Sequence, residues 1–261
     1  MLRTVTVGVD GSPESRAAAE WAARERRISW EAVQGLRLRH PGIEVAVEHV
    51  TGRPSEVLCS AANSSELLAL GSRGLGGVGG WLLGSVELSV VAHAERPVVL
   101  VRAGEQAVDE HEMDPAGVPS AAAAFRPVVL GLDIKRPDES LIGFAFEAAV
   151  RRATSLRVVY GWNPPSSYAY GLATVPECQE ALARGVAAAL AEVLRPWRQK
   201  FPHVEVLEQS RYGSPAHHLV DASLVVVGRR IRRSPLGAHI GTVTHAVVHH
   251  AAVPVAVVPH D

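Results

Sequence analysis

The sequence predicts an α/β protein built from two tandem domains, each with a doubly wound parallel sheet. Short runs rich in valine and leucine alternate with amphipathic or alanine-rich stretches, as in a parallel sheet that helices cover on both faces. A glycine pattern also occurs twice. Its members pair as Gly71 with Gly228, Gly84 with Gly241, and Ser85 with Thr242. This repeat divides the chain into two related halves.

Length and composition agree with two domains. The chain has 261 residues, about twice the commonest domain size of ~100 to 150 residues. A formal net charge of −1 gives no electrostatic argument for binding nucleic acid or an anionic membrane. Cys59 and Cys178 form no CxxC pair, so neither a disulfide framework nor a cysteine zinc site is expected. Without a signal peptide or a long apolar stretch, we expect a cytoplasmic protein.

We expect a first domain over residues 1–103, a linker over 104–125 and a second domain over 126–261. The linker is acidic and then rich in alanine, and it contains two prolines and two glycines. In the second domain, strands are predicted at 127–133, 156–162, 204–209, 224–228 and 253–258. Helices are predicted between them at 139–152, 176–200, 215–222 and 242–251.

The first half is shorter than the second. The segment around Pro41 matches the segment around Pro202, and what is missing before it is the counterpart of the strand at 156–162 and most of the following helix. The first domain therefore lacks strand two, and we expect four strands in it. We also expect the strand at 44–50 to pair directly with the strand at 4–9, because an open gap would leave buried backbone groups unpaired.

The glycine motif of the first half lies between a strand end and a helix start. Residues 67–71 form an apolar run, and Ser85 begins a run of helical period. At such a place the backbone can approach an anion closely, and the helix N-terminus offers unpaired N–H groups and the positive end of its dipole. The first strand of each half also ends in an aspartate, Asp10 or Asp133.

The full motif G-x2-G-x9-G-[ST], formed by Gly71, Gly74, Gly84 and Ser85, resembles that of tandem universal stress proteins of actinobacteria. The resemblance covers nearly all of both halves. It implies the adenine nucleotide alpha hydrolase-like fold and binding of ATP or AMP, with Mg²⁺ as a companion ion. The positions that it implicates are Val9, Asp10, Gly11, Ser12, Gly71, Arg73, Gly74, Gly84, Ser85, Val86, Asp133, Gly161, Gly228, Arg230, Gly241 and Thr242.

The two halves depart from the family pattern in opposite ways. The first half has the full phosphate motif but lacks strand two, which lines the adenine pocket in the family. The second half keeps Tyr160 and Gly161 at the end of strand two, but Ile231 replaces the second motif glycine, and a β-branched residue disfavours positive φ. We therefore expect the first half to be the better phosphate site and the second half to be the better base site.

Several of these features also have a purely structural interpretation. The glycines could serve packing, and either aspartate could only cap the following helix. The arginines at 229, 230, 232 and 233 are more typical of a solvated loop than of a ligand site. His245 and His249 have the spacing of a metal pair, but no third ligand is apparent, so no metal site is expected. The pattern Gly74-x-Gly76-x-x-Gly79 follows the wrong strand for a dinucleotide fingerprint.

Three functions remain open. The resemblance favours a non-catalytic stress-response protein whose contacts with partners depend on the bound nucleotide. A weak ATP hydrolase or phosphotransferase is the second, with Asp10 and Glu14 as the nearby candidate groups. The third is a structural interaction module whose nucleotide sites have decayed.

The last strand of each half is expected to join the halves. Residues 97–101 and 254–258 are rich in β-branched side chains and carry no charge, so each would be an exposed sheet edge that invites pairing. In family dimers the corresponding strands pair across the interface. We therefore expect them to pair antiparallel within one chain as a pseudo-dimer, and any homodimer to use another surface.

Overall fold

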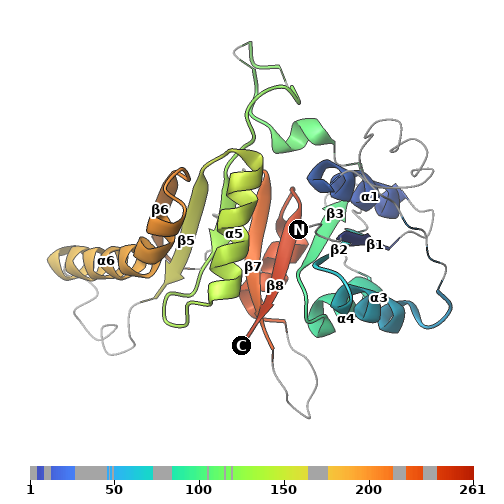
Figure 1. The fold of residues 1–261 in the computed structure, drawn as a ribbon. Coiled ribbons are helices and arrows are strands. Elements are labelled where there is room, and N and C mark those ends of the chain that lie inside the picture. Colours follow the sequence, from blue (N-terminus) through green and yellow to red (C-terminus); the bar gives the residue numbers. More distant parts are fainter. Residues whose placement is uncertain are drawn as a thin grey trace.

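The computed structural model describes residues 5–8, 13–26, 46, 48, 50–72, 84–104, 106–114, 116–118, 120–163, 176–213, 222–231 and 240–261. Its strands form one eight-stranded sheet in the order β1-β2-β3-β8-β7-β4-β5-β6 (Figure 1). The first three strands come from the first half of the chain and the other five from the second. The α/β architecture predicted from the alternating pattern is confirmed.

The described elements of the first half are β1 (Val5–Val7), α1 (Pro13–Arg26), α3 (Pro54–Asn63), β2 (Leu67–Ser72), α4 (Ser85–His93) and β3 (Val98–Arg102). A 3-10 helix, η1 (Ala107–Glu110), follows. Those of the second half are β4 (Val128–Gly131), α5 (Glu139–Arg152), β5 (Leu156–Trp162), α6 (Pro176–Lys200), β6 (Val206–Tyr212), β7 (Leu224–Arg230), α7 (Thr242–His250) and β8 (Val255–His260).

The second half follows the sequence prediction closely. The predicted bounds of α5, β5 and α6 are those observed, while the other elements shift by a few residues at their ends. Helix α5 begins where it does because the Asp138 carboxylate accepts hydrogen bonds from the backbone N–H groups of Ser140 and Leu141, at 2.9 and 3.0 Å. The helix predicted at 215–222 falls almost entirely outside the described residues.

Among the described residues, β1 is the outermost strand of the first half. Residues 27–45, where the sequence places the loss of strand two, lie outside the description, so that loss stays a prediction. The predicted strand at 44–50 is not observed in its described residues. Residues 46, 48 and 50 belong to no strand, and Val50 is 56% exposed. Within the described part, β1 pairs only with β2. The expected pairing of the strand at 44–50 with the first strand is therefore wrong at residues 46, 48 and 50, and residues 44, 45, 47 and 49 lie outside the description. Alternating valines favour a strand, but a strand forms only where a partner completes its hydrogen bonds.

The two halves meet at β3 and β8, which lie side by side in Figure 1. They pair antiparallel, with Val98 opposite Val257, Val99 opposite Ala256 and Leu100 opposite Val255. All other strand pairs in the sheet are parallel. The predicted antiparallel pairing within one chain is confirmed, and it removes the two apolar edges that separate halves would expose.

We expect cysteines introduced by Val99→Cys and Ala256→Cys to form a disulfide within one chain. Opposite residues of an antiparallel pair have Cα atoms about 4.5 to 5.5 Å apart, which lies in the disulfide range. The test uses a chain in which Cys59 and Cys178 are replaced by serine, since both are free thiols. Non-reducing gel electrophoresis should show a faster monomer band, and each single cysteine variant is the control. Crosslinking that occurs only between chains would contradict the pairing.

Both faces of the sheet carry a core that the two halves share. On one face, α1, α5 and α6 cover a cluster that contains Val99 of β3 and Ala256 of β8. On the other, α3, α4 and α7 cover a cluster that contains Leu100 and Val255 of the same two strands. The β3–β8 junction is therefore buried on both sides, as in the middle of a single domain.

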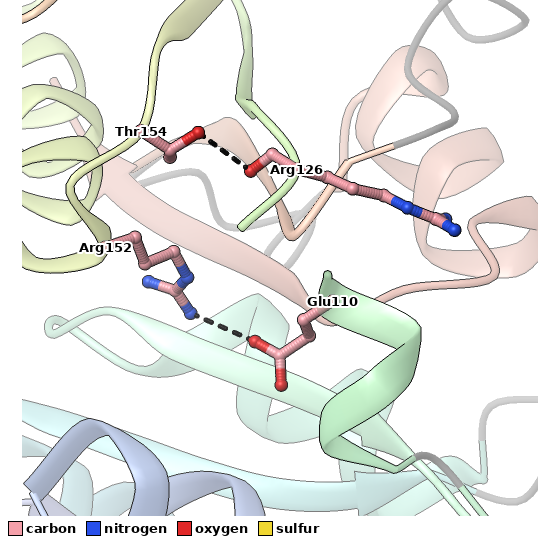
Figure 2. A network of polar contacts seen from close by, with 4 residues as sticks. All are labelled: Glu110, Arg126, Arg152 and Thr154. Carbon is pink, nitrogen blue, oxygen red and sulfur yellow. Dashed lines mark hydrogen bonds and ion pairs between the residues drawn. The ribbon is translucent and has the colours of Figure 1, made fainter. Parts of the chain in front are cut away.

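The segment between the halves is folded in the part that the structure describes. His111 and Phe125 form an antiparallel bridge with ring centroids 4.0 Å apart. Figure 2 shows Arg152 at the end of α5 reaching Glu110 of η1, and Thr154 donating to the backbone oxygen of Arg126. The guanidinium of Arg152 also lies 6.0 Å from the ring of Trp21 in α1. One buried arginine thus contacts the linker and both halves.

Candidate functional site

The parallel strands β5, β4 and β7 end at the same edge of the sheet. Strand β4 lies between β5 and β7, and the chain continues from β4 to β5 on one side and returns to β7 on the other. Ligands of open α/β sheets bind outside the carboxyl ends of the strands where the order reverses in this way. Asp133, Gly161 and Gly228, which the sequence analysis selected, all lie at or just beyond these strand ends.

Asp133 is exposed and follows the end of β4. One of its carboxylate oxygens accepts a hydrogen bond from the backbone N–H of Lys135 at 3.1 Å. It therefore closes the local turn. It does not cap the following helix, which was the structural alternative for this residue, because the N-cap of α5 is Asp138. Its charge also reaches β5: burial raises the pKa of the Tyr160 hydroxyl, and Asp133 raises that pKa further. The aspartate and the end of β5 are thus electrostatic neighbours.

Gly71 and Gly228, the first glycine of the motif in each half, are required by packing. A Cβ on Gly71 would overlap the backbone carbonyl group of Glu14 in α1. A Cβ on Gly228 would lie 2.6 Å from Nε2 of His260 and 3.0 Å from a methyl carbon of Leu141. The absence of a side chain at Gly71 lets the backbone of α1 pack closely against β2. The absence of a side chain at Gly228 leaves room for the side chains of His260 and Leu141. Arg230 follows two residues later and pairs with His260 in the β7–β8 register.

Gly84 and Gly241, the last glycines of the motif, are the N-caps of α4 and α7. Their backbones are alike, with φ of −66° and −60° and extended ψ. Ser85 and Thr242 open the helices as exposed residues, and Val86 packs against the core under α4. Neither N-cap has positive φ, so the backbone conformation does not require glycine at either position.

The side chains around these two N-caps differ. The three nearest atoms to a Cβ built at Gly84 all belong to the carboxyl group of Glu87. A Cβ built at Gly241 meets nothing within 4 Å. In the direction of a Cβ, Gly241 therefore faces open space, whereas Gly84 faces the carboxylate of Glu87. Residues 73–83 and 232–239, which precede the two N-caps, lie outside the description.

Part of the predicted site lies outside the described residues. This applies to Val9, Asp10, Gly11, Ser12, Arg73 and Gly74. Ile231, which replaces the second glycine in the second half, is described, and its backbone N–H donates to the backbone oxygen of His260. This bond ties the beginning of the second-half loop to the end of β8.

Arg229 is buried, contrary to the expectation of a solvated loop for this arginine run. Its side chain is in the interior, and its guanidinium donates to the backbone oxygen of Ala94 at the end of α4. Burial lowers the pKa of this guanidinium, while Cys59 and Glu95 raise it. Side chains alternate between the two faces of a strand, so Arg229 lies on the same face of β7 as the buried Val225 and Val227. This alternation could have indicated from the sequence that Arg229 is buried. Arg232 and Arg233 lie outside the description.

His245 and His249 lie on one face of α7 with ring centroids 4.2 Å apart. Burial lowers the pKa of His245, and His249 and His250 lower it further. The described residues contain no group of three or more histidine, cysteine, aspartate or glutamate side chains able to hold a metal ion. Among the described helices, none is both long enough and apolar enough to cross a membrane.

Comparison with known proteins gives consistent matches over the whole chain. The model of the universal stress protein family matches residues 27–102 and 124–259. A universal stress protein of Mycolicibacterium smegmatis is 30% identical over 304 residues, covering 97% of this chain and 96% of the relative. One from Mycobacterium tuberculosis is 29% identical over 299 residues. Both alignments are longer than this chain, so each relative has residues for which this chain has no counterpart.

Solved structures agree on the fold. The crystal structure of a universal stress protein from Archaeoglobus fulgidus matches with a TM-score of 0.59 at 15% identity, covering 99% of this chain and 86% of that one. A structure described as a putative universal stress protein from Pseudomonas aeruginosa matches with a TM-score of 0.56 at 16% identity. At these identities the likeness concerns the fold.

Proposed function

This chain belongs to the universal stress protein family, and from that premise we propose that it binds an adenine nucleotide, ATP or AMP, at the carboxyl edge of β5, β4 and β7. The observation that carries the proposal is the reversal of strand order at β4, with Asp133 after β4 and Gly228 near the end of β7. Nucleotide occupancy would change the contacts that the protein makes in a stress response, without catalysis.

The described residues fit the two ends of such a ligand. The end of β5, with Tyr160 and Gly161, would border the base, and Asp133 would lie beside it. Gly241 and Thr242 begin α7 with open space around the N-cap, and the free N–H groups of a helix start suit phosphate oxygens. Gly228 and Arg230 would flank the phosphates. A Mg²⁺ ion would be held chiefly by the phosphates themselves.

The first half is the second candidate place for the nucleotide. Its residues in this role are Val9, Asp10, Gly11, Ser12, Gly71, Arg73, Gly74, Gly84, Ser85 and Val86. The carboxylate of Glu87 beside Gly84 leads us to prefer the second half for the phosphates, in contrast to the order expected from the motif alone.

We expect Gly241→Val to weaken ATP binding at least ten-fold and AMP binding less. A β-branched side chain at this N-cap would fill the space where the terminal phosphates approach the helix start. Isothermal titration of the intact chain with ATP and AMP measures the effect. The matched control is Gly84→Val, at the equivalent position of the first half, which should change ATP affinity little.

Two further outcomes decide the proposal. Nucleotide extracted from freshly purified protein should be adenine nucleotide, and ATP incubated with the protein and Mg²⁺ should remain intact. If the wild-type chain neither retains nor binds adenine nucleotide, binding as the function is wrong. Hydrolysis of many ATP molecules by each protein molecule would instead favour a hydrolase.

A further inference from the structure

We propose that the carboxylate of Glu87 occupies the phosphate position at the start of α4 and thereby closes the first half to nucleotide phosphates. The inference rests on the proposed nucleotide-binding function and adds a division of labour to it. The second half would take the phosphates, and the first half would carry a built-in anion in their place.

The position of Glu87 in its helix allows this contact. Gly84 is the N-cap of α4, so Glu87 is the third residue of the helix. A glutamate at this position can turn back toward the N-cap, and Glu87 does so without a capping-box hydrogen bond. Around the direction of a Cβ on Gly84, the nearest atoms are Oε2, Cδ and Oε1 of Glu87, the last two at 3.2 and 3.4 Å. The whole carboxyl group of Glu87 therefore lies beside Gly84, the glycine at which the motif would expose the backbone to a phosphate.

The charge of this group opposes a second anion. The positive end of the helix dipole favours a negative charge at a helix start, and Glu87 supplies that charge from within the chain. A phosphate that entered would have to displace the carboxylate or lie beside a like charge, which is unfavourable at short range. The first half thus has a glycine motif that is complete in sequence, with a carboxylate against its last glycine.

The second half shows what the same backbone does without the glutamate. The third residue of α7 is Thr244, and its hydroxyl donates to the backbone oxygen of Gly228 at 2.7 Å. This side chain turns toward β7 and is buried, so the space at Gly241 stays open. The backbone bonds are equivalent: Leu88 N–H donates to Gly84 O at 3.1 Å, and His245 N–H donates to Gly241 O at 2.8 Å. The side chain at the third position therefore makes the difference.

The test replaces Glu87 in chains whose second half has been disabled by Gly241→Val. We expect Glu87→Thr, which installs the residue found in the second half, to raise ATP affinity at least ten-fold over the Gly241→Val chain. Glu87→Gln keeps the shape and removes the charge, so it should raise ATP affinity as well. The matched control is Glu56→Gln, an exposed glutamate in the first turn of α3, which should leave affinity unchanged. Titration calorimetry gives affinity and stoichiometry.

Each outcome decides the inference. If wild-type protein binds ATP but neither Glu87 variant binds it more tightly than the Gly241→Val chain, the inference is wrong while the proposed function stands. If the wild type binds nothing and Glu87→Thr binds ATP, the inference holds and the assignment of phosphates to the second half fails. If neither the wild-type chain nor any variant binds ATP, the proposed nucleotide binding and the role of Glu87 are both overturned. Circular dichroism confirms that each variant is folded.

Discussion

Glu110→Ala is expected to lower the free energy of unfolding by about 3 to 5 kcal/mol, the usual loss when one member of a buried ion pair is removed. The side chains of Glu110 and Arg152 are 3% and 2% exposed, and their charged atoms lie 3.5 Å apart. Without the carboxylate, the guanidinium would remain buried among Phe125, Trp21 and backbone groups. Urea denaturation followed by circular dichroism measures the change.

Two variants show whether this loss comes from removing one member of a buried ion pair. Glu112→Ala, two residues along the linker and exposed, should change stability by less than about 0.5 kcal/mol. The double variant Glu110→Leu with Arg152→Met replaces both buried charges with apolar side chains of similar size, and it should be more stable than Glu110→Ala alone. A Glu110→Ala chain as stable as the Glu112→Ala chain would contradict the role assigned to the pair.

Gly71→Ala is expected to cost about 3 kcal/mol or more, because the added methyl group would overlap backbone atoms. The atoms in the way are the carbonyl group of Glu14 and the nitrogen of Ser15 at 2.5 Å, both in the first turn of α1. A side chain could rotate away, but here the whole helix would have to move, and its Ala18 and Trp21 are buried in the shared core. Thermal unfolding of the purified variant measures the loss.

The matched control is Gly185→Ala in the middle of α6. Gly185 is exposed, and a Cβ there meets nothing within 4 Å. Alanine favours a helix interior over glycine by up to about 1 kcal/mol, so this variant should be more stable than the wild type. Equal effects at the two positions would show that Gly71 is not held against α1 as described.

Both predictions bear on the junction of the two halves. Trp21 of α1, Glu110 of η1 and Arg152 of α5 come from the first half, the linker and the second half, and they meet on one side of the sheet. On the other side, Arg229 of β7 holds the end of α4. Together with the β3–β8 pairing, these contacts make the tandem halves one folded unit in the described part of the chain.

The sequence by itself determined the class of fold, the described elements of the second half to within a few residues, and the way the halves join. These features depend on local or repeated signals. Helix α5 is delimited by its cap at Asp138, α6 by the period of its apolar face, and β3 and β8 by their uncharged, β-branched composition. The loss of strand two is a prediction of the same kind, because the second half provides an internal reference for the first.

Only the tertiary structure decided which charges are buried and which glycines face open space. The burial of Arg229 depends on the end of α4, far away in the sequence, and that of Arg152 depends on a linker whose composition resembles a loop. Glu87 and Thr244 occupy equivalent positions, yet one side chain turns back to its N-cap and the other bonds to β7. A one-dimensional pattern records spacing, whereas the electrostatics of a site depend on which distant groups the packing brings within a few ångströms of each other.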